Sequence, residues 1–183
     1  MTNTRTVRGK VFLKMNMKTL LKRLIFYWIS SFVLATLMYF ILWLIMPQHY
    51  VFGVLYRMFV YHVEFPLQYI AIPCFIYGII ATLLADKFSN KNIPGQILLT
   101  IIIIVSTILL SSPFGGALWH YHDMKAGHFP SNWVSKMLGE GFTWGLELGW
   151  LIIGLSIPYN IIGSITCFFL TKKGVELYNS TNQ

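Results

Sequence analysis

Four long runs of apolar residues, separated by polar segments, dominate this chain of 183 residues. They cover Leu24 to Met46, about Pro66 to Ala85, Gly95 to about Ser112, and about Phe142 to Leu170. Each run approaches or exceeds the roughly 20 residues that an α-helix needs to cross a bilayer core about 30 Å thick. The pattern predicts an all-α integral membrane protein in which four transmembrane helices form an antiparallel bundle.

The composition agrees with this class. Hydrophobic residues make up 56% of the chain and charged residues only 11%, with a mean hydropathy of +0.62. A soluble domain carries about 25% charged residues, so an ordinary cytosolic domain, a disordered tail and a coiled coil are excluded. The first run is longer than the roughly 7–15 apolar residues of a signal peptide, and we expect it to remain as an anchor.

Basic residues mark one side of the predicted bundle. Half of the 14 basic residues precede or begin the first apolar run, with no acidic residue among them: Arg5, Arg8, Lys10, Lys14, Lys18, Lys22 and Arg23. The turn after the second run (Lys87, Lys91) and the C-terminal tail (Lys172, Lys173) are also basic. Because cytoplasmic flanks of membrane helices carry excess Lys and Arg, we expect both termini on the cytoplasmic side of a plasma membrane.

This topology divides the chain into a basic cytoplasmic segment (1–23), a four-span membrane domain (24–170) and a cytoplasmic tail (171–183). A basic block in a soluble protein would suggest nucleic acid, but beside a long apolar run it serves to orient a helix. Membrane lipids, and not nucleic acid, are therefore the expected partners of these residues.

Histidines mark the other side. All five lie in the two segments predicted to be extracytoplasmic, 47–65 and 113–141: His49, His62, His120, His122 and His128. Both segments are rich in aromatic residues, which are typical anchors of binding interfaces. Gly and Pro residues interrupt the second segment, and this punctuation predicts a structured loop.

The group around His120 and His122 admits three interpretations. In an extended chain the two side chains point the same way and, with His128, would hold a divalent metal or haem; on a helix they would lie about 200° apart. In the second interpretation, Asp123 orients a histidine that acts as a general base. In the third, the imidazoles form hydrogen bonds at the membrane–water interface and bind no ligand. The spacing matches no established zinc motif.

A single carboxylate, Glu147, lies inside the fourth apolar run. Helical spacing places it on one stripe with Glu140 and Trp144, which predicts a face turned inward or towards a wet cavity. There it would accept a proton or balance a positive charge. The alternative is that the span begins after Glu147 and leaves this carboxylate among the headgroups.

Three glycines, Gly141, Gly145 and Gly149, form a G-x-x-x-G-x-x-x-G pattern on the same predicted helix. Small residues at this spacing allow two helix backbones to approach closely. The pattern predicts close packing within the bundle or, as the alternative, a homodimer.

The sequence contains no nucleotide-binding, nucleophile-elbow or kinase motif. We therefore expect a non-enzymatic accessory or regulatory protein that binds a membrane-protein partner, or senses a signal, through its extracytoplasmic segments. The alternative is a membrane enzyme of the hydrolase or acyltransferase type, acting on a lipid or lipid-linked substrate. Its acid–base residues would be His120, His122, Asp123 and Glu147.

Overall fold

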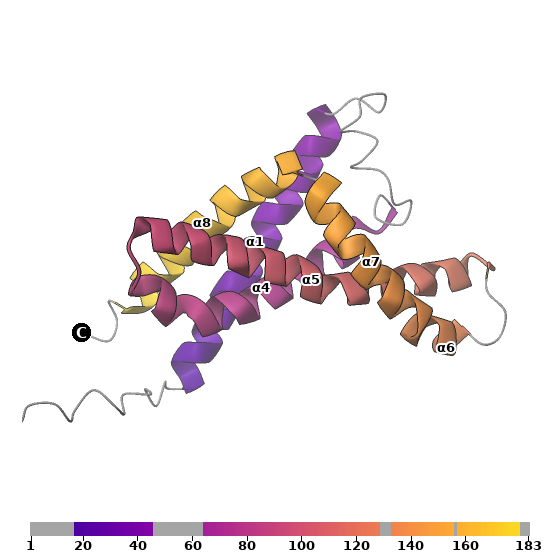
Figure 1. The fold of residues 1–183 in the computed structure, drawn as a ribbon, viewed down its shortest axis with the longest axis horizontal. Coiled ribbons are helices and arrows are strands. Elements are labelled where there is room, and N and C mark those ends of the chain that lie inside the picture. Colours follow the sequence, from indigo (N-terminus) through magenta and orange to yellow (C-terminus); the bar gives the residue numbers. More distant parts are fainter. Residues whose placement is uncertain (1–16, 46–63, 129–132, 156, 180–183) are drawn as a thin grey trace, which may run out of the picture.

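The computed structural model describes residues 17–45, 64–128, 133–155 and 157–179. In this part of the chain the regular elements are all helices: α1 (Met17–Ile45), α4 (Pro66–Ser89), α5 (Ile93–Lys125), α6 (Trp133–Leu138), α7 (Glu140–Leu155) and α8 (Ile157–Asn179) (Figure 1). Of these, α1, α4 and α5 are long and apolar enough to cross a membrane. The predictions of an all-α chain and of a membrane protein are therefore confirmed.

Local sequence signals set the start of α4 and α5. Pro66 stands in the first turn of α4, where a missing backbone N–H costs no hydrogen bond. The side chain of Asn92 caps α5 by accepting a hydrogen bond from the Gly95 amide at 3.2 Å, and Pro94 occupies the first turn. Only the short turn 90–92 separates the two helices, so α4 and α5 form an antiparallel hairpin.

The helix α5 continues well past its predicted end. The sequence predicts a span that ends near Ser112 and a loop beyond it, whereas the helix runs through Pro113 to Lys125. The prediction of a loop over 113–125 was wrong, because Pro113 removes only one backbone hydrogen bond. The hydroxyl groups of Ser111 and Ser112 bond to the Ile108 carbonyl at 3.1 and 2.6 Å in the turn before the proline.

A glycine ends α5. Gly127 has a φ of 84°, a conformation that glycine adopts without steric cost. The amide of His128 donates to the Asp123 carbonyl at 3.0 Å, and the Gly127 amide donates to the Met124 carbonyl at 3.0 Å. This is the Schellman pattern of a helix end, so the helix stops at a glycine fourteen residues after Pro113.

The fourth apolar run is divided. The sequence predicts one span from about Phe142 to Leu170 that is interrupted at Pro158, and the structure has two helices there, α7 and α8. Pro158 fits this division, because it stands in the first turn of α8, where a missing backbone N–H costs no hydrogen bond.

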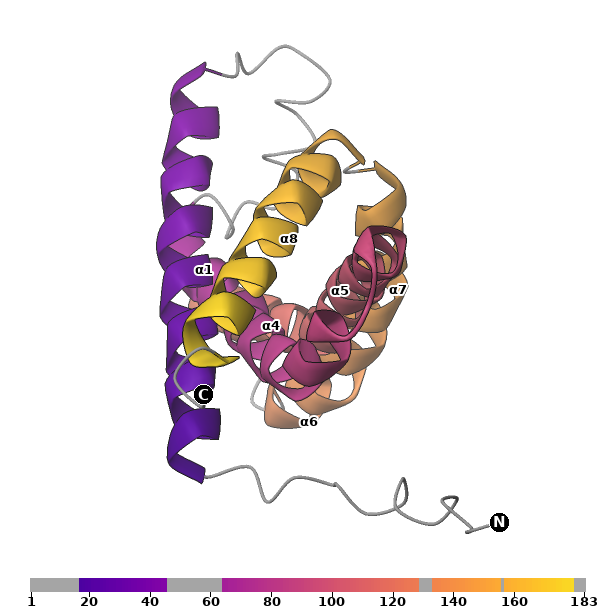
Figure 2. The same ribbon diagram turned by 90° about the vertical axis from the view of Figure 1, so that its left-hand side faces the viewer.

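Two helices each contact two others along their length: α5 lies against α4 and α7, and α1 lies against α4 and α8. The helix α1 runs obliquely from lower left to upper right in Figure 1 and upright in Figure 2, whereas α5 lies across Figure 1 and is strongly foreshortened in Figure 2. The helix α1 therefore crosses the α4–α5 hairpin steeply. The described helices do not confirm the antiparallel four-helix bundle that the sequence predicts.

Buried tyrosines connect α1, α4 and α8. Tyr27 is fully buried and Tyr77 nearly so, in a cluster with Ala81, Ile103 and Leu170. The Tyr27 hydroxyl donates to the carbonyl oxygen of Thr171 at 3.1 Å, and the Tyr77 hydroxyl lies 2.8 Å from the Thr171 hydroxyl. These bonds satisfy the phenols of Tyr27 and Tyr77, and they join the three helices through polar contacts.

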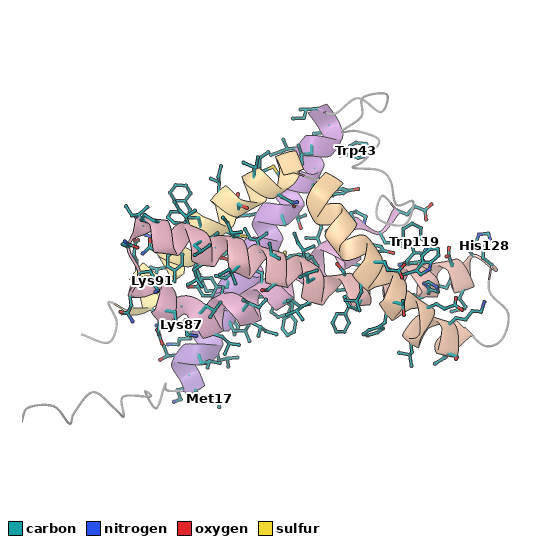
Figure 3. The ribbon with its side chains drawn as sticks, viewed as in Figure 1. Met17, Trp43, Lys87, Lys91, Trp119 and His128 are labelled. Carbon is teal, nitrogen blue, oxygen red and sulfur yellow. The ribbon has the colours of Figure 1, made fainter. Side chains whose placement is uncertain are left out.

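The basic segments that are distant in sequence meet at one end of the molecule. An ion pair of 2.9 Å between Arg23 and Asp86 joins the start of α1 to the end of α4. The rings of Phe26 and Tyr178 lie 5.9 Å apart and join α1 to the end of α8. We call this the basic end; its described basic residues are Lys18, Lys22, Arg23, Lys87, Lys91, Lys172 and Lys173. In Figure 3, Met17, Lys87 and Lys91 lie on one side of the molecule and Trp119 and His128 on the other.

Large apolar side chains cover the outside of the long helices. Leu44 is 74% exposed on α1, Leu83 65% on α4 and Leu98 60% on α5. A surface of this extent is unfavourable in water and favourable against lipid chains. The apolar residues of α1, α4 and α5 therefore serve mainly as lipid contacts, and the core is small.

Candidate functional site

The histidines that the sequence singles out lie at the end opposite the basic end. We call this region the histidine end: residues 113–128 of α5 and its cap, α6, and the first turns of α4 and α7. On the helix, His120 and His122 point to different neighbours. His120 meets α7, where the edge of its ring contacts Trp144 with centroids 5.8 Å apart. Its Nδ1 lies 3.1 Å from the Gly116 carbonyl oxygen, one turn earlier.

His122 meets the start of α4 instead. Its Nε2 donates a hydrogen bond to the side-chain oxygen of Gln68 at 3.0 Å. Its ring stacks on Phe65, with centroids 4.2 Å apart and planes 6° from parallel. Each of the two imidazoles, His120 and His122, is only 5% exposed. Both rings therefore hold helices together, as buried polar side chains with protein partners usually do.

This geometry bears directly on the metal hypothesis. A site shared by His120 and His122 requires an extended chain, and the helix places the two rings about 200° apart. His128 is exposed beyond the cap of α5. Across the described ranges, no group of three or more His, Cys, Asp or Glu side chains is placed to hold a metal ion. His49 and His62 lie outside those ranges.

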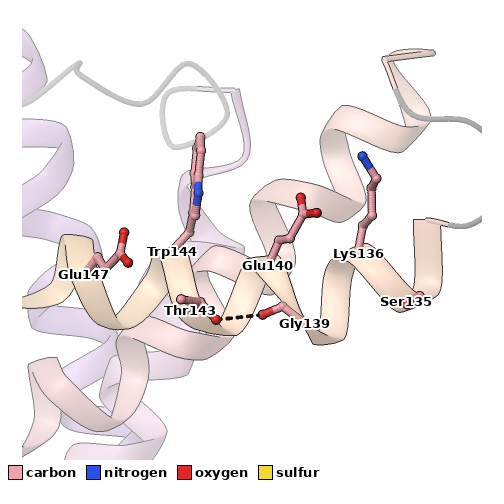
Figure 4. A pocket seen from close by; sticks show the side chains of 7 residues that line it. All are labelled: Ser135, Lys136, Gly139, Glu140, Thr143, Trp144 and Glu147. Carbon is pink, nitrogen blue, oxygen red and sulfur yellow. Dashed lines mark hydrogen bonds between the residues drawn. The ribbon is translucent and has the colours of Figure 1, made fainter.

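An open groove of about 560 Å³ lies on α6 and α7 (Figure 4), and one of its lining residues, Trp144, contacts His120. Its lining combines two carboxylates, one lysine, one indole and smaller polar groups: Ser135, Lys136, Gly139, Glu140, Thr143, Trp144 and Glu147. Figure 4 shows Lys136, Glu140, Trp144 and Glu147 pointing to the same side. The stripe of Glu140, Trp144 and Glu147 predicted from helical spacing thus lines one groove.

The helix that carries most of the groove, α7, approaches α5 closely. A Cβ atom on Gly145 would lie 2.7 Å from the Cα of Pro113, and one on Gly116 would lie 2.8 Å from the Gly145 amide nitrogen. Gly141 faces Ala117 in the same way, at 3.0 Å from its Cα. Gly141 and Gly145 thus pack within the chain; the surroundings of Gly149 lie outside the described residues.

Sequence reasoning missed several residues of this region. Gln68 and Phe65, which contact His122, had no signal because they lie at least 54 positions from it in the sequence. Lys136 enters the groove only because the short helix α6 leads directly into α7. Gly116 had a usable signal: Ser112 and Gly116 form a small-x-x-x-small pair that matches the glycines of α7.

Comparison of the chain with protein family models, with curated proteins and with solved structures finds no match. Functional assignment therefore depends on the geometry of the histidine end.

The structural role of the imidazoles can be tested directly. We expect the double variant His120→Ala/His122→Ala to lose about 2–4 kcal/mol of unfolding free energy, because it removes two rings that are buried where helices meet. The double variant and wild type, purified in mild detergent, should show the same metal content by elemental analysis. Stoichiometric metal in wild type that is lost in the variant would contradict this role. His128→Ala, which removes an exposed imidazole, is the control.

Proposed function

We propose that this is a non-enzymatic accessory or regulatory membrane protein that binds a membrane-protein partner through the groove on α6 and α7. The observation that carries the proposal is the exposed indole of Trp144, which is 54% exposed and stands between the carboxylates of Glu140 and Glu147. His120 and His122 are buried, so the groove is more accessible to a partner than these two imidazoles are.

The groove has the features of an interface anchor. Tryptophan dominates the binding energy of many protein interfaces, and charged groups around it add specificity. The contact with His120 holds the indole from behind, which reduces the entropy lost when a partner binds. Lys136, Glu140 and Glu147 supply the charged rim.

We further propose four membrane crossings in a plasma membrane, with α7 and α8 together forming the fourth, and both termini in the cytoplasm. The gathering of Lys18, Lys87 and Lys172 at one end supports this topology, because basic flanks favour the cytoplasmic side. The helix α1 crosses the α4–α5 hairpin steeply. If all three helices cross one membrane, the membrane normal lies between the axis of α1 and the axis of the hairpin, and each helix is tilted from that normal.

A membrane enzyme of the hydrolase or acyltransferase type, acting on a lipid or lipid-linked substrate, is the second candidate. The groove favours it in one respect: Glu140 and Glu147 are two carboxylates on one wall, with Lys136 beside them. Such groups supply acid–base catalysis in hydrolytic sites.

Photo-crosslinking in native membranes tests the binding proposal. A photoreactive amino acid at position 143, in the groove, should give a discrete adduct with a second protein. The same amino acid at position 110, where Leu110 is 56% exposed on the apolar part of α5, should give lipid adducts only. Adducts confined to lipid at both positions would overturn the proposal. Adducts only with a second copy of this chain would also overturn it and would show that the groove is the interface of a homodimer.

The indole itself supplies the quantitative prediction. Removing a central tryptophan from an interface costs about 2 kcal/mol or more, so Trp144→Ala should lower the adduct yield at position 143 at least about tenfold at limiting partner. Leu146→Ala is the matched control, because Leu146 is similarly exposed (52%) on the same helix but does not line the groove. Equal loss in both variants would show that the tryptophan is not an anchor.

A further inference from the structure

We infer that the basic end binds the phosphate headgroups of anionic phospholipids. The binding surface is built from α1, α4 and α8, and it contacts the lipids of one leaflet. This inference concerns the end opposite the groove and does not depend on the proposed function. Its starting point is that three lysine-bearing segments, far apart in sequence, come together there.

Positive charge is in clear excess at this end. Seven basic side chains of the described ranges lie there with only two acidic ones, Asp86 and Glu176. Asp86 pairs with the buried Arg23 at 2.9 Å, and Glu176 lies 3.9 Å from Lys173. The remaining lysines are exposed: Lys18, Lys22, Lys87, Lys91 and Lys172. The surface therefore favours an anion.

The packing of the helices fixes the positions of these lysines relative to one another. The ion pair between Arg23 and Asp86 places Lys22 and Lys87 on adjoining segments, because each is the sequence neighbour of one partner. The bond from Tyr27 to the Thr171 carbonyl does the same for Lys172. The folded helices thus present a prearranged group of cations, which an unfolded basic segment would not.

Apolar side chains beside the lysines identify a lipid as the anion. Leu83 is 65% exposed and lies one turn before Lys87 on the same face of α4. Phe169 is 63% exposed and lies one turn before Lys173 on α8. On α1, Leu21 is 52% exposed and follows Lys18 by three residues. Each helix therefore offers a cation for a phosphate and, one turn away, an apolar surface for the acyl chain.

The histidine end has the opposite charge balance. Its described charged side chains are four acidic and two basic: Glu64, Asp123, Glu140, Glu147, Lys125 and Lys136. An anionic headgroup would be repelled there and attracted at the basic end. The molecule thus distinguishes its two ends by charge, and we expect anionic lipid to be enriched only around the basic one.

Lipid retention measured by native mass spectrometry tests this inference. The full chain is reconstituted in nanodiscs of equal phosphatidylglycerol and phosphatidylcholine, then released in mild detergent. Wild type should retain phosphatidylglycerol in preference, and high salt should reduce that preference. In Lys22→Gln/Lys87→Gln the preference for phosphatidylglycerol should fall several-fold. The upper limit is about fivefold for each lysine removed, because one basic residue near the membrane surface contributes about 1 kcal/mol. Lys125→Gln/Lys136→Gln removes the same charge at the other end and should retain the wild-type preference.

Three results would overturn the inference. One is equal retention of the two lipids by wild type. This result is measured on wild type alone and does not depend on the folding of any variant. Another is an equal fall in both double variants, since this would indicate a response to total charge alone. The third is displacement of phosphatidylglycerol by millimolar inorganic phosphate, because the surface would then bind free phosphate and not a lipid.

Discussion

Gly145→Ala should destabilise the protein by at least about 2 kcal/mol, although alanine is the better helix former. The added Cβ would lie 2.7 Å from the Cα of Pro113, and the backbone of α5 cannot rotate away as a flexible side chain would. Overpacking of this kind typically costs about 1–3 kcal/mol, and here it also separates Trp144 from His120. Unfolding followed by tryptophan fluorescence in mild detergent measures the loss.

Gly115→Ala is the matched control for this prediction. Gly115 is on α5 next to Gly116, but a Cβ there would have no atom within 4 Å. The substitution should therefore stabilise the helix by about 0.5–1 kcal/mol through propensity alone. Opposite signs at Gly145 and Gly115 would establish that the α5–α7 contact sets the effect. Unchanged stability in Gly145→Ala would show that the two helices are not in close contact.

Asp86→Ala should cost about 2 kcal/mol of unfolding free energy. Arg23 is 2% exposed, so removal of this carboxylate leaves its guanidinium buried without its acidic partner. Breaking a buried ion pair costs about 3–5 kcal/mol, and the value is lower here because the Asp86 side chain is 45% exposed and partly screened by solvent. Denaturant unfolding monitored by circular dichroism gives the difference.

Two further variants distinguish burial from charge in this pair. Arg23→Met/Asp86→Ala removes both charges and should be more stable than Asp86→Ala, because no buried cation remains. Glu176→Ala breaks the exposed pair with Lys173 and should change stability by less than about 0.5 kcal/mol. A loss in Glu176→Ala as large as that in Asp86→Ala would contradict the assignment of the effect to burial.

The sequence alone determined the class of the protein and several of its helix ends. Apolar runs predict the three long apolar helices, since length and hydropathy decide whether a helix is stable in lipid. Pro66 and Asn92 mark the starts of α4 and α5 through interactions within one turn. The basic segments were also visible as composition, although their meeting at one end was not.

The tertiary structure decided what the chemically active side chains contact. His122 reaches Gln68, 54 positions away, and Arg23 reaches Asp86, 63 positions away, only because α4 packs against α5 and α1. The helix α7 packs on α5 through Gly145 and Gly116, and Gly116 belongs to the part of α5 that continues beyond Pro113. Local preferences act within a few residues, whereas the direction of a side chain at a helix crossing depends on which helices pack there. For this reason the sequence could indicate which residues of the histidine end to consider, but it could not predict which residues they contact.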